Sequence, residues 1–304
     1  SSARTKEGPV VTALVQHVLD ALSVGSTYAL LALGLTLVFS VMNLINFAYG
    51  LLLVWGGYGA CVLVDAGLPF VLVVPLCILF VTALSMAMGR VAFRPFIGAP
   101  QITLLITSFG VLLIMQYIAI LIFGEKPRVL NTPDFLTGVI AAGGLRVPVL
   151  QVVTIAGGAI VVAAFYGLLH RTPFGAHLRA AAESPETARL MGIRPDRVLM
   201  IAFAISGAIA GVVGLLWFAK VGAVTPRSDL EPTLKAFIAI VLGGLGRTSG
   251  AMLGGLALGG IEVAMNVVLP SGAITYAQAI VFAVVIALLV LRPGGLSGAR
   301  TEAA

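Results

Sequence analysis

The chain has 304 residues, of which 60% are apolar and only 10% are charged, and its mean hydropathy is +1.11. A soluble domain carries about a quarter charged residues, so this composition excludes a water-soluble globular protein and a disordered chain. The formal net charge of +6 indicates basic cytoplasmic loops beside a lipid bilayer rather than a nucleic-acid-binding surface. We therefore expect contact with lipid and none with nucleic acid.

Long stretches without Asp, Glu, Lys or Arg mark the membrane spans. About 20 apolar residues cross a bilayer as a helix, and continuous rather than alternating apolar runs exclude a transmembrane barrel. We predict an all-α, polytopic membrane protein with eight or nine spans, at about 18–40, 48–64, 69–89, 103–123, 148–169, 198–219, 233–246, 250–268 and 275–291. Residues 1–17 form an N-terminal segment, 18–292 form a single transmembrane domain, and 293–304 form a tail.

Two of these predicted spans are irregular. The charge-free run between Asp20 and Asp65 is too long for one span and too short for three, so it must break internally. Two asparagines and a glycine between residues 42 and 50 supply the place for a broken helix. The helix near 233–246 is short, and it either spans the membrane or re-enters it.

The positions of Lys and Arg predict the orientation. Loop 170–197 is the strongest cytoplasmic candidate because it holds five arginines: Arg171, Arg179, Arg189, Arg194 and Arg197. Residues Arg90 and Arg94 fall on the same side, two spans earlier, and segment 124–147 becomes the longest outer segment. The N-terminus then lies outside, although Arg4 and Lys6 argue weakly against that. Three further arginines reach the cytoplasm if 233–246 spans: Arg247, Arg292 and Arg300.

A polar segment inside loop 170–197 predicts a short helix of about two turns. Ser184 can cap a helix that begins at Pro185, Glu186 then lies in its first turn, and Gly192 can end it. Two interpretations stay open. The helix is a solvated connection, or it is a docking helix that inserts Ala188, Leu190 and Met191 into a groove on a cytoplasmic partner.

Polar residues inside the predicted spans are candidates for a translocation path. The amides of Asn43 and Asn46 could bind a substrate, or they satisfy the backbone of the broken helix. Thr107 and Ser108 interrupt the fourth span, and bonding of their hydroxyls back to their own helix is the favoured interpretation.

Glu262 is the acid that lies deep in an apolar run. A carboxylate inside the membrane indicates a functional site, but a structural residue near the outer end of its helix is an equal alternative. No buried Lys or Arg is near it in the sequence, so no proton relay is predicted.

Glycines spaced four residues apart place small residues on one helix face. Such faces let helix backbones approach closely in lipid, and packing within one subunit is favoured over a subunit interface. The pairs are Gly207 with Gly211, Gly250 with Gly254, and Gly255 with Gly259.

Sequence motifs for covalent chemistry are missing. The chain has no G-x-x-x-x-G-K-[ST] phosphate loop and no nucleophile elbow. Its three histidines, His17, His170 and His177, lack the spacing of metal ligands. We therefore predict no metal site, no bound cofactor and no enzyme activity in this chain.

Four segments resemble the permeases of high-affinity branched-chain amino-acid ABC importers. Residues 43–50 (N-L-I-N-F-A-Y-G) resemble that family's N-L-I-N-F-A-H-G, with Tyr49 in place of His, and 91–100 (V-A-F-R-P-F-I-G-A-P) resemble V-A-Y-R-P-L-R-G-A-P, with Ile97 in place of a basic residue. Residues 242–246 (L-G-G-L-G) and 291–296 (L-R-P-G-G-L) are also similar. The spacing of Glu186, Ala188 and Gly192 resembles the E-A-A-x-x-x-G core of the coupling loop of ABC importers, with Thr187 in place of the second Ala.

The resemblance implies a permease subunit in the bacterial inner membrane that forms the path for Leu, Ile and Val. It implies two cytoplasmic ATPase subunits that bind ATP and Mg²⁺, a second and longer permease subunit, and a periplasmic solute-binding protein. It places coupling to the ATPase at Glu183, Glu186, Ala188, Arg189, Leu190, Met191 and Gly192. The candidate substrate path, taken from the polar residues inside the spans, is Asn43, Asn46, Tyr49, Thr107 and Ser108, with Glu262 as a possible intramembrane acid.

Other solutes and other classes of transporter stay open. The resembled family also serves urea, short amides and aromatic or small carboxylates. An ion-coupled secondary transporter or a facilitative channel is the alternative from another class, although sparse intramembrane acids argue against ion coupling. An intramembrane enzyme would need a paired catalytic constellation, which the sequence does not show.

Overall fold

The computed structural model describes the chain except residues 1–6, 44–45, 143–144, 271–275 and 292–304. The predicted tail at 293–304 therefore lies outside the described residues. So do four basic residues that were used to predict orientation or family: Arg4, Lys6, Arg292 and Arg300.

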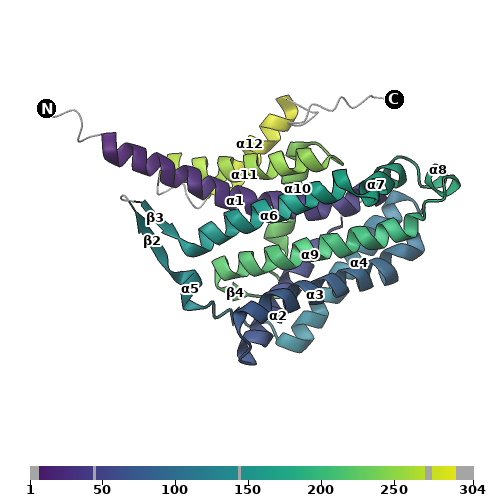
Figure 1. Ribbon diagram of the computed structural model, residues 1–304, viewed down its shortest axis with the longest axis horizontal. Coiled ribbons are helices and arrows are strands. Elements are labelled where there is room, and N and C mark those ends of the chain that lie inside the picture. The colour runs from purple at the N-terminus through teal and green to yellow at the C-terminus, as the bar shows by residue number, and fades with distance from the viewer. Residues whose placement is uncertain (1–6, 44–45, 143–144, 271–275, 292–304) are drawn as a thin grey trace.

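The described chain is a bundle of helices, as predicted (Figure 1). Its α-helices are α1 Glu7–Met42, α2 Tyr49–Asp65, α3 Phe70–Met88, α4 Gln101–Phe123, α5 Asp134–Thr137, α6 Val149–Arg171, α7 Pro173–Glu183, α8 Pro185–Leu190, α9 Pro195–Val221, α10 Leu230–Gly243, α11 Thr248–Val268 and α12 Ala277–Leu291. A π-helix (η1, Gly89–Phe93) and a 3₁₀ turn (η2, Arg94–Phe96) extend α3. Within the described residues, four short strands form two antiparallel pairs: β1 Arg128–Val129 with β4 Ala223–Val224, and β2 Val139–Ala142 with β3 Leu145–Pro148.

Six helices among the described residues are long and apolar enough to cross a membrane. They are α1, α3, α4, α6, α9 and α11, and α2 and α12 are shorter apolar helices. The predicted spans match these helices closely. For example, the predicted span 103–123 corresponds to Gln101–Phe123. The first span is the exception: α1 begins at Glu7 rather than near residue 18, and its 36 residues give about 54 Å, well beyond a bilayer core of about 30 Å.

The long helices differ in how much of their surface the chain itself covers. The most apolar windows of α1 and α9 are 67% buried, whereas those of α4 and α3 are only 17% and 22% buried. The first pair therefore forms the centre of the bundle together with α2. The second pair turns apolar side chains outward, where lipid or another subunit can cover them.

The glycine pairs pack inside this chain. A Cβ atom on Gly255 would overlap the backbone of Ala29, and one on Gly259 would overlap that of Gly25. Helix α11 therefore lies directly against α1, backbone to backbone. Gly207 and Gly211 admit α3 against α9 in the same way. The favoured interpretation, packing within one subunit, is confirmed for these positions.

The bundle has two chemically different ends. Strands β2 and β3 lie with α5 at one end of the long helices, and α7 and α8 lie at the opposite end (Figure 1). We call residues 124–148 and their surroundings the hairpin end, and loop 170–197 and its surroundings the arginine end. An ion pair from Arg94 to Asp196, 3.5 Å, places the end of α3 at the arginine end, as the sequence predicted.

The chain between α9 and α11 crosses the bundle in two pieces. After β4 pairs with β1 at the hairpin end, residues 224–229 run along α2: Val224 packs at Gly57 and Asp229 at Gly50. Helix α10 continues from there, and its 14 residues give only about 21 Å. The Ser40 hydroxyl donates to the Gly246 carbonyl at 3.5 Å, so this piece ends beside the last turn of α1.

Candidate functional site

The segment between α7 and α9 forms the predicted short helix, α8. The backbone N–H of Thr187 donates to the Ser184 hydroxyl at 3.2 Å, which caps the helix as expected. Gly192 ends it with φ +80°, a left-handed conformation that glycine adopts without strain.

Helix α8 divides its side chains between the bundle and the outside. Leu190 is 89% exposed and Met191 63% exposed, whereas Ala188 is completely buried against its own chain. The inclusion of Ala188 among the docking residues is therefore wrong, because α8 needs that small side chain to pack on the bundle. The four remaining predicted coupling residues are exposed: Glu183, Glu186, Arg189 and Gly192.

The predicted break between α1 and α2 is present. Helix α1 stops at Met42, Asn43 adopts φ +50°, and α2 starts at Tyr49. The amide of Gln101 donates to the Asn43 carbonyl at 3.0 Å. Asparagine tolerates this left-handed conformation better than most residues, which explains why the helix can end here without a glycine.

Asn46 and Ser108 meet inside the bundle, and both are buried. The Ser108 hydroxyl accepts a hydrogen bond from the backbone N–H of Phe47 at 2.7 Å and lies 3.4 Å from Oδ1 of Asn46. The same Oδ1 accepts from the N–H of Ala48 at 3.1 Å. These bonds satisfy the broken backbone. The Nδ2 of Asn46 is buried and has no partner among the described residues.

Thr107 and Tyr49 have other surroundings. The hydroxyl of Thr107 donates to the carbonyl of Thr103 at 2.8 Å, so the predicted bond back to its own helix is confirmed for Thr107, whereas Ser108 bonds across to the break. Tyr49 is buried, and its ring hydroxyl lies against Gly34 of α1. The residues predicted to form one substrate path therefore have different packing roles in the structure.

The break reaches the arginine end. A cavity of about 190 Å³ lies between the end of α1, residues 97–99 and the end of α7, and Asn43 and Glu183 both line it. A candidate path residue and a candidate coupling residue thus share one cavity. Movement of α7 would change the walls around Asn43.

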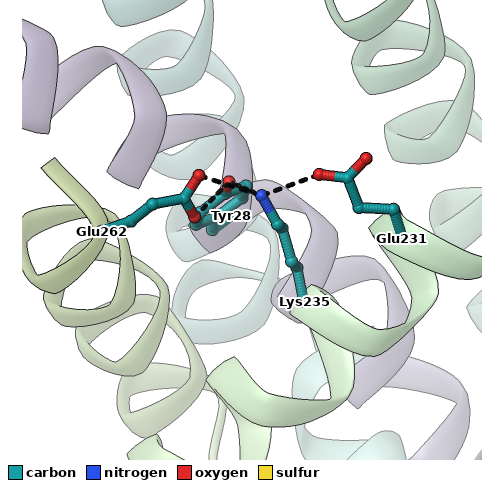
Figure 2. A network of polar contacts seen from close by, with 4 residues as sticks. All are labelled: Tyr28, Glu231, Lys235 and Glu262. Carbon is teal, nitrogen blue, oxygen red and sulfur yellow. Dashed lines mark hydrogen bonds and ion pairs between the residues drawn. The ribbon is translucent and has the colours of Figure 1, made fainter. Parts of the chain in front are cut away.

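A charged cluster around the buried Lys235 joins α1, α10 and α11, and Figure 2 shows its four residues. The Nζ atom of Lys235 lies 3.0 Å from Oε1 of Glu262 and 2.9 Å from Oε1 of Glu231. It also donates to the Tyr28 hydroxyl, which donates to Oε2 of Glu262 at 2.7 Å. Glu262 has no buried basic residue near it in the sequence, but packing of α10 on α11 brings Lys235 to it.

Sequence reasoning missed Lys235 and Tyr28. Lys235 is a basic residue within the predicted span 233–246, with 6% of its surface exposed. A charged residue in an apolar segment was a usable signal, because such a residue needs a partner within the bundle.

Comparison with known proteins identifies the family. A family profile described as "Branched-chain amino acid transport system / permease component" matches residues 17–289. The chain is 30% identical over 302 residues to the high-affinity branched-chain amino acid transport system permease protein BraD of Pseudomonas aeruginosa, covering 95% of this chain and 97% of that protein.

Two further relatives span most of the chain. The permease protein LivH of Escherichia coli K12, named for the same transport system, is 31% identical, covering 93% of this chain and 95% of that protein. The ribose import permease protein RbsC of Haemophilus influenzae is 26% identical, covering 91% and 84%. Because the profile covers most of the sequence and the six long apolar helices agree with it, this chain is a multi-pass membrane protein of the branched-chain amino acid transport permease family.

Proposed function

We propose that this chain is a permease subunit of an ABC importer, that it lies in the bacterial inner membrane, and that it forms the inward path for Leu, Ile and Val. The family profile and the names of the BraD and LivH relatives support this substrate class. The apolar core of the bundle suits an apolar side chain, although apolar walls alone do not select one solute.

The observation that carries the coupling role is the exposed tip of α8. Leu190 and Met191 project from a short capped helix at the arginine end, where five arginines predict the cytoplasm. Two adjacent exposed apolar side chains on a rigid helix suit insertion into an apolar groove of another protein. Because the sequence has no phosphate loop, the ATP and Mg²⁺ that drive transport would bind to separate ATPase subunits.

The remaining partners follow from the importer class. A second, longer permease subunit would complete the pore. One of the two ATPase subunits would dock at α8 of this chain, and the other would dock on the second permease subunit. A solute-binding protein would deliver substrate at the hairpin end. The strongly exposed apolar surfaces of α3 and α4 leave area for a second permease subunit or for lipid.

A paired substitution tests the coupling role. Leu190→Glu with Met191→Glu should abolish co-purification with the ATPase subunits and ATP-driven leucine uptake, because two charges would enter the apolar groove. Phe135→Glu is the matched control, since Phe135 is 61% exposed but lies on α5 at the hairpin end. Retention of the ATPase complex and of uptake in the double variant would overturn the docking role.

Transport of another solute is the second candidate function, because one relative that covers most of this chain is named for ribose import. Urea, short amides and aromatic or small carboxylates are the other solutes to test beside ribose. Uptake assays with each compound in the assembled importer decide between them: competition by valine and isoleucine, but not by ribose or urea, supports the proposed substrate.

A further inference from the structure

The charged cluster around Lys235 borders a cavity of about 250 Å³ toward the hairpin end. The cavity lies between four helices: α1, α10, α11 and the last turns of α9. The side chains of Lys220 and Trp217 form part of its wall. Its size is just below the range of about 300–1,000 Å³ for sites of drug-sized ligands. A small solute fits such a space better than a large one.

The cluster beside the cavity contains more carboxylates than ammonium groups. Lys235 is already engaged, because its ammonium group donates hydrogen bonds to Tyr28 and Glu262 and forms an ion pair with Glu231. One ammonium therefore faces two carboxylates, which leaves the cluster with one excess negative charge. A second cation could join Glu262 or Glu231 with little displacement of Lys235.

A second, separate charge also lines this cavity. Lys220 lines it from the end of α9, and no described residue forms an ion pair with its ammonium group. The lining thus combines an excess of carboxylate with an ammonium group that has no ion-pair partner among the described residues. Val24, Leu216 and Trp217 add apolar side chains to the same lining.

From this arrangement we propose that the cavity is a binding site for a zwitterionic α-amino acid with an apolar side chain. The α-ammonium group of the ligand binds the carboxylates of Glu262 and Glu231, and its carboxylate binds Lys220. The side chain packs against Leu216 and Trp217. Charge-assisted hydrogen bonds at both ends select a zwitterion over an amine or an acid.

The position of the cavity suits reception of solute from outside. It is lined by the end of α9 and the start of α10, which lie toward the hairpin end. This inference rests on the proposed function, because it assigns the first site that an imported amino acid meets after release at the hairpin end.

Fluorescence of Trp217 tests the site without any partner subunit. The chain has two tryptophans, so Trp55→Phe leaves Trp217 as the single emitter in full-length protein reconstituted in lipid nanodiscs. Leucine should change the emission saturably. Isoamylamine, which lacks the carboxylate, and 4-methylpentanoate, which lacks the ammonium, should each bind at least about tenfold more weakly, since each loses a hydrogen bond to a charged group.

Two variants and two controls assign the charges. Lys220→Met should weaken leucine binding about tenfold and leave isoamylamine unchanged, whereas Glu262→Gln should remove the preference for leucine over 4-methylpentanoate. Lys126→Met and Glu125→Gln change the same charges on exposed residues of the hairpin end and should change neither preference. Lys220 is exposed, so its variant should fold even if the Glu262 variant does not.

The outcomes separate the site from the importer. Absence of a saturable leucine signal, equal binding of leucine and both analogues, or unchanged leucine affinity in Lys220→Met would overturn the site. ATP-driven leucine uptake by the assembled importer would still stand in each case. Selective binding of the zwitterion without any ATP-driven uptake would overturn the proposed function and leave the site intact.

Discussion

The ammonium group of Lys235 lies 3.0 Å from the carboxylate of Glu262, and this ion pair joins α10 to α11 across 27 residues of sequence. Lys235 is nearly fully buried, with 8% of its side chain exposed, and Glu262 retains 25%. Removing one partner of a buried pair leaves an uncompensated charge, which costs more than the pair contributes. Replacing either residue alone should therefore destabilise the packing of α10 on α11.

Loss of the buried ammonium should destabilise the bundle. Lys235→Met is expected to lower the free energy of unfolding by roughly 3 kcal/mol, because Glu262 would lose its charge partner. The double variant with Glu262→Gln should recover part of this loss. Thermal unfolding in detergent measures both, with Lys126→Met as the exposed control. Equal loss in the single and double variants would show that packing of the Lys235 stem, not its charge, holds α10.

Two glycines of α11 should respond differently to replacement by alanine, because only one of them lies against α1. Gly255→Ala should cost about 1–3 kcal/mol, because the added methyl would overlap the backbone of Ala29. Gly260→Ala meets no atom within 4 Å and should be neutral or stabilising by up to about 1 kcal/mol. Melting temperatures of the two purified variants decide this. Equal melting temperatures would contradict the close packing.

The neighbouring hydroxyl groups of Ser108 and Thr107 on α4 should also differ in how much they contribute to stability. Ser108→Ala removes the acceptor of the Phe47 N–H at the break, and about 1–2 kcal/mol of stability should be lost. Thr107→Val removes only a bond to its own helix and should cost less than about 0.5 kcal/mol. Hydrogen exchange at the Phe47 amide provides the direct measurement. Unchanged protection in Ser108→Ala would show that the hydroxyl is not the acceptor.

Opposite ends of the bundle should face opposite compartments. Leu190→Cys at the arginine end should react with a membrane-impermeant thiol reagent only after the cell is permeabilised, whereas Phe135→Cys should react in intact cells. Both residues are exposed, and the native Cys61 and Cys77 are buried and give little background. Labelling of Leu190→Cys from outside would reverse the orientation and remove α8 from the ATPase.

The positions of charge predicted most of the fold. Apolar runs need about the length of a bilayer, so the gaps between charges gave the helices to within a few residues over α3, α4 and α6. The break at Asn43, the Ser184 cap and the Gly192 terminus were also predictable, because each depends on local backbone chemistry.

Contacts between distant segments were not predictable in this way. Lys235 pairs with Glu262 only because α10 packs on α11, and Ser108 reaches Phe47 only because α4 lies beside the break. Ala188 was misassigned for the same reason, since a helix of six residues gives too little periodicity to separate its buried face from its exposed face. Single-sequence patterns specify elements, and packing specifies their neighbours.

Transport in sealed vesicles tests the central claim most directly. Vesicles that contain this chain, the second permease subunit and both ATPase subunits should accumulate radiolabelled leucine against its gradient when ATP and the solute-binding protein are supplied. Vesicles that contain this chain alone should not. Leucine uptake by this chain alone, driven by an ion or leucine gradient, would contradict the account.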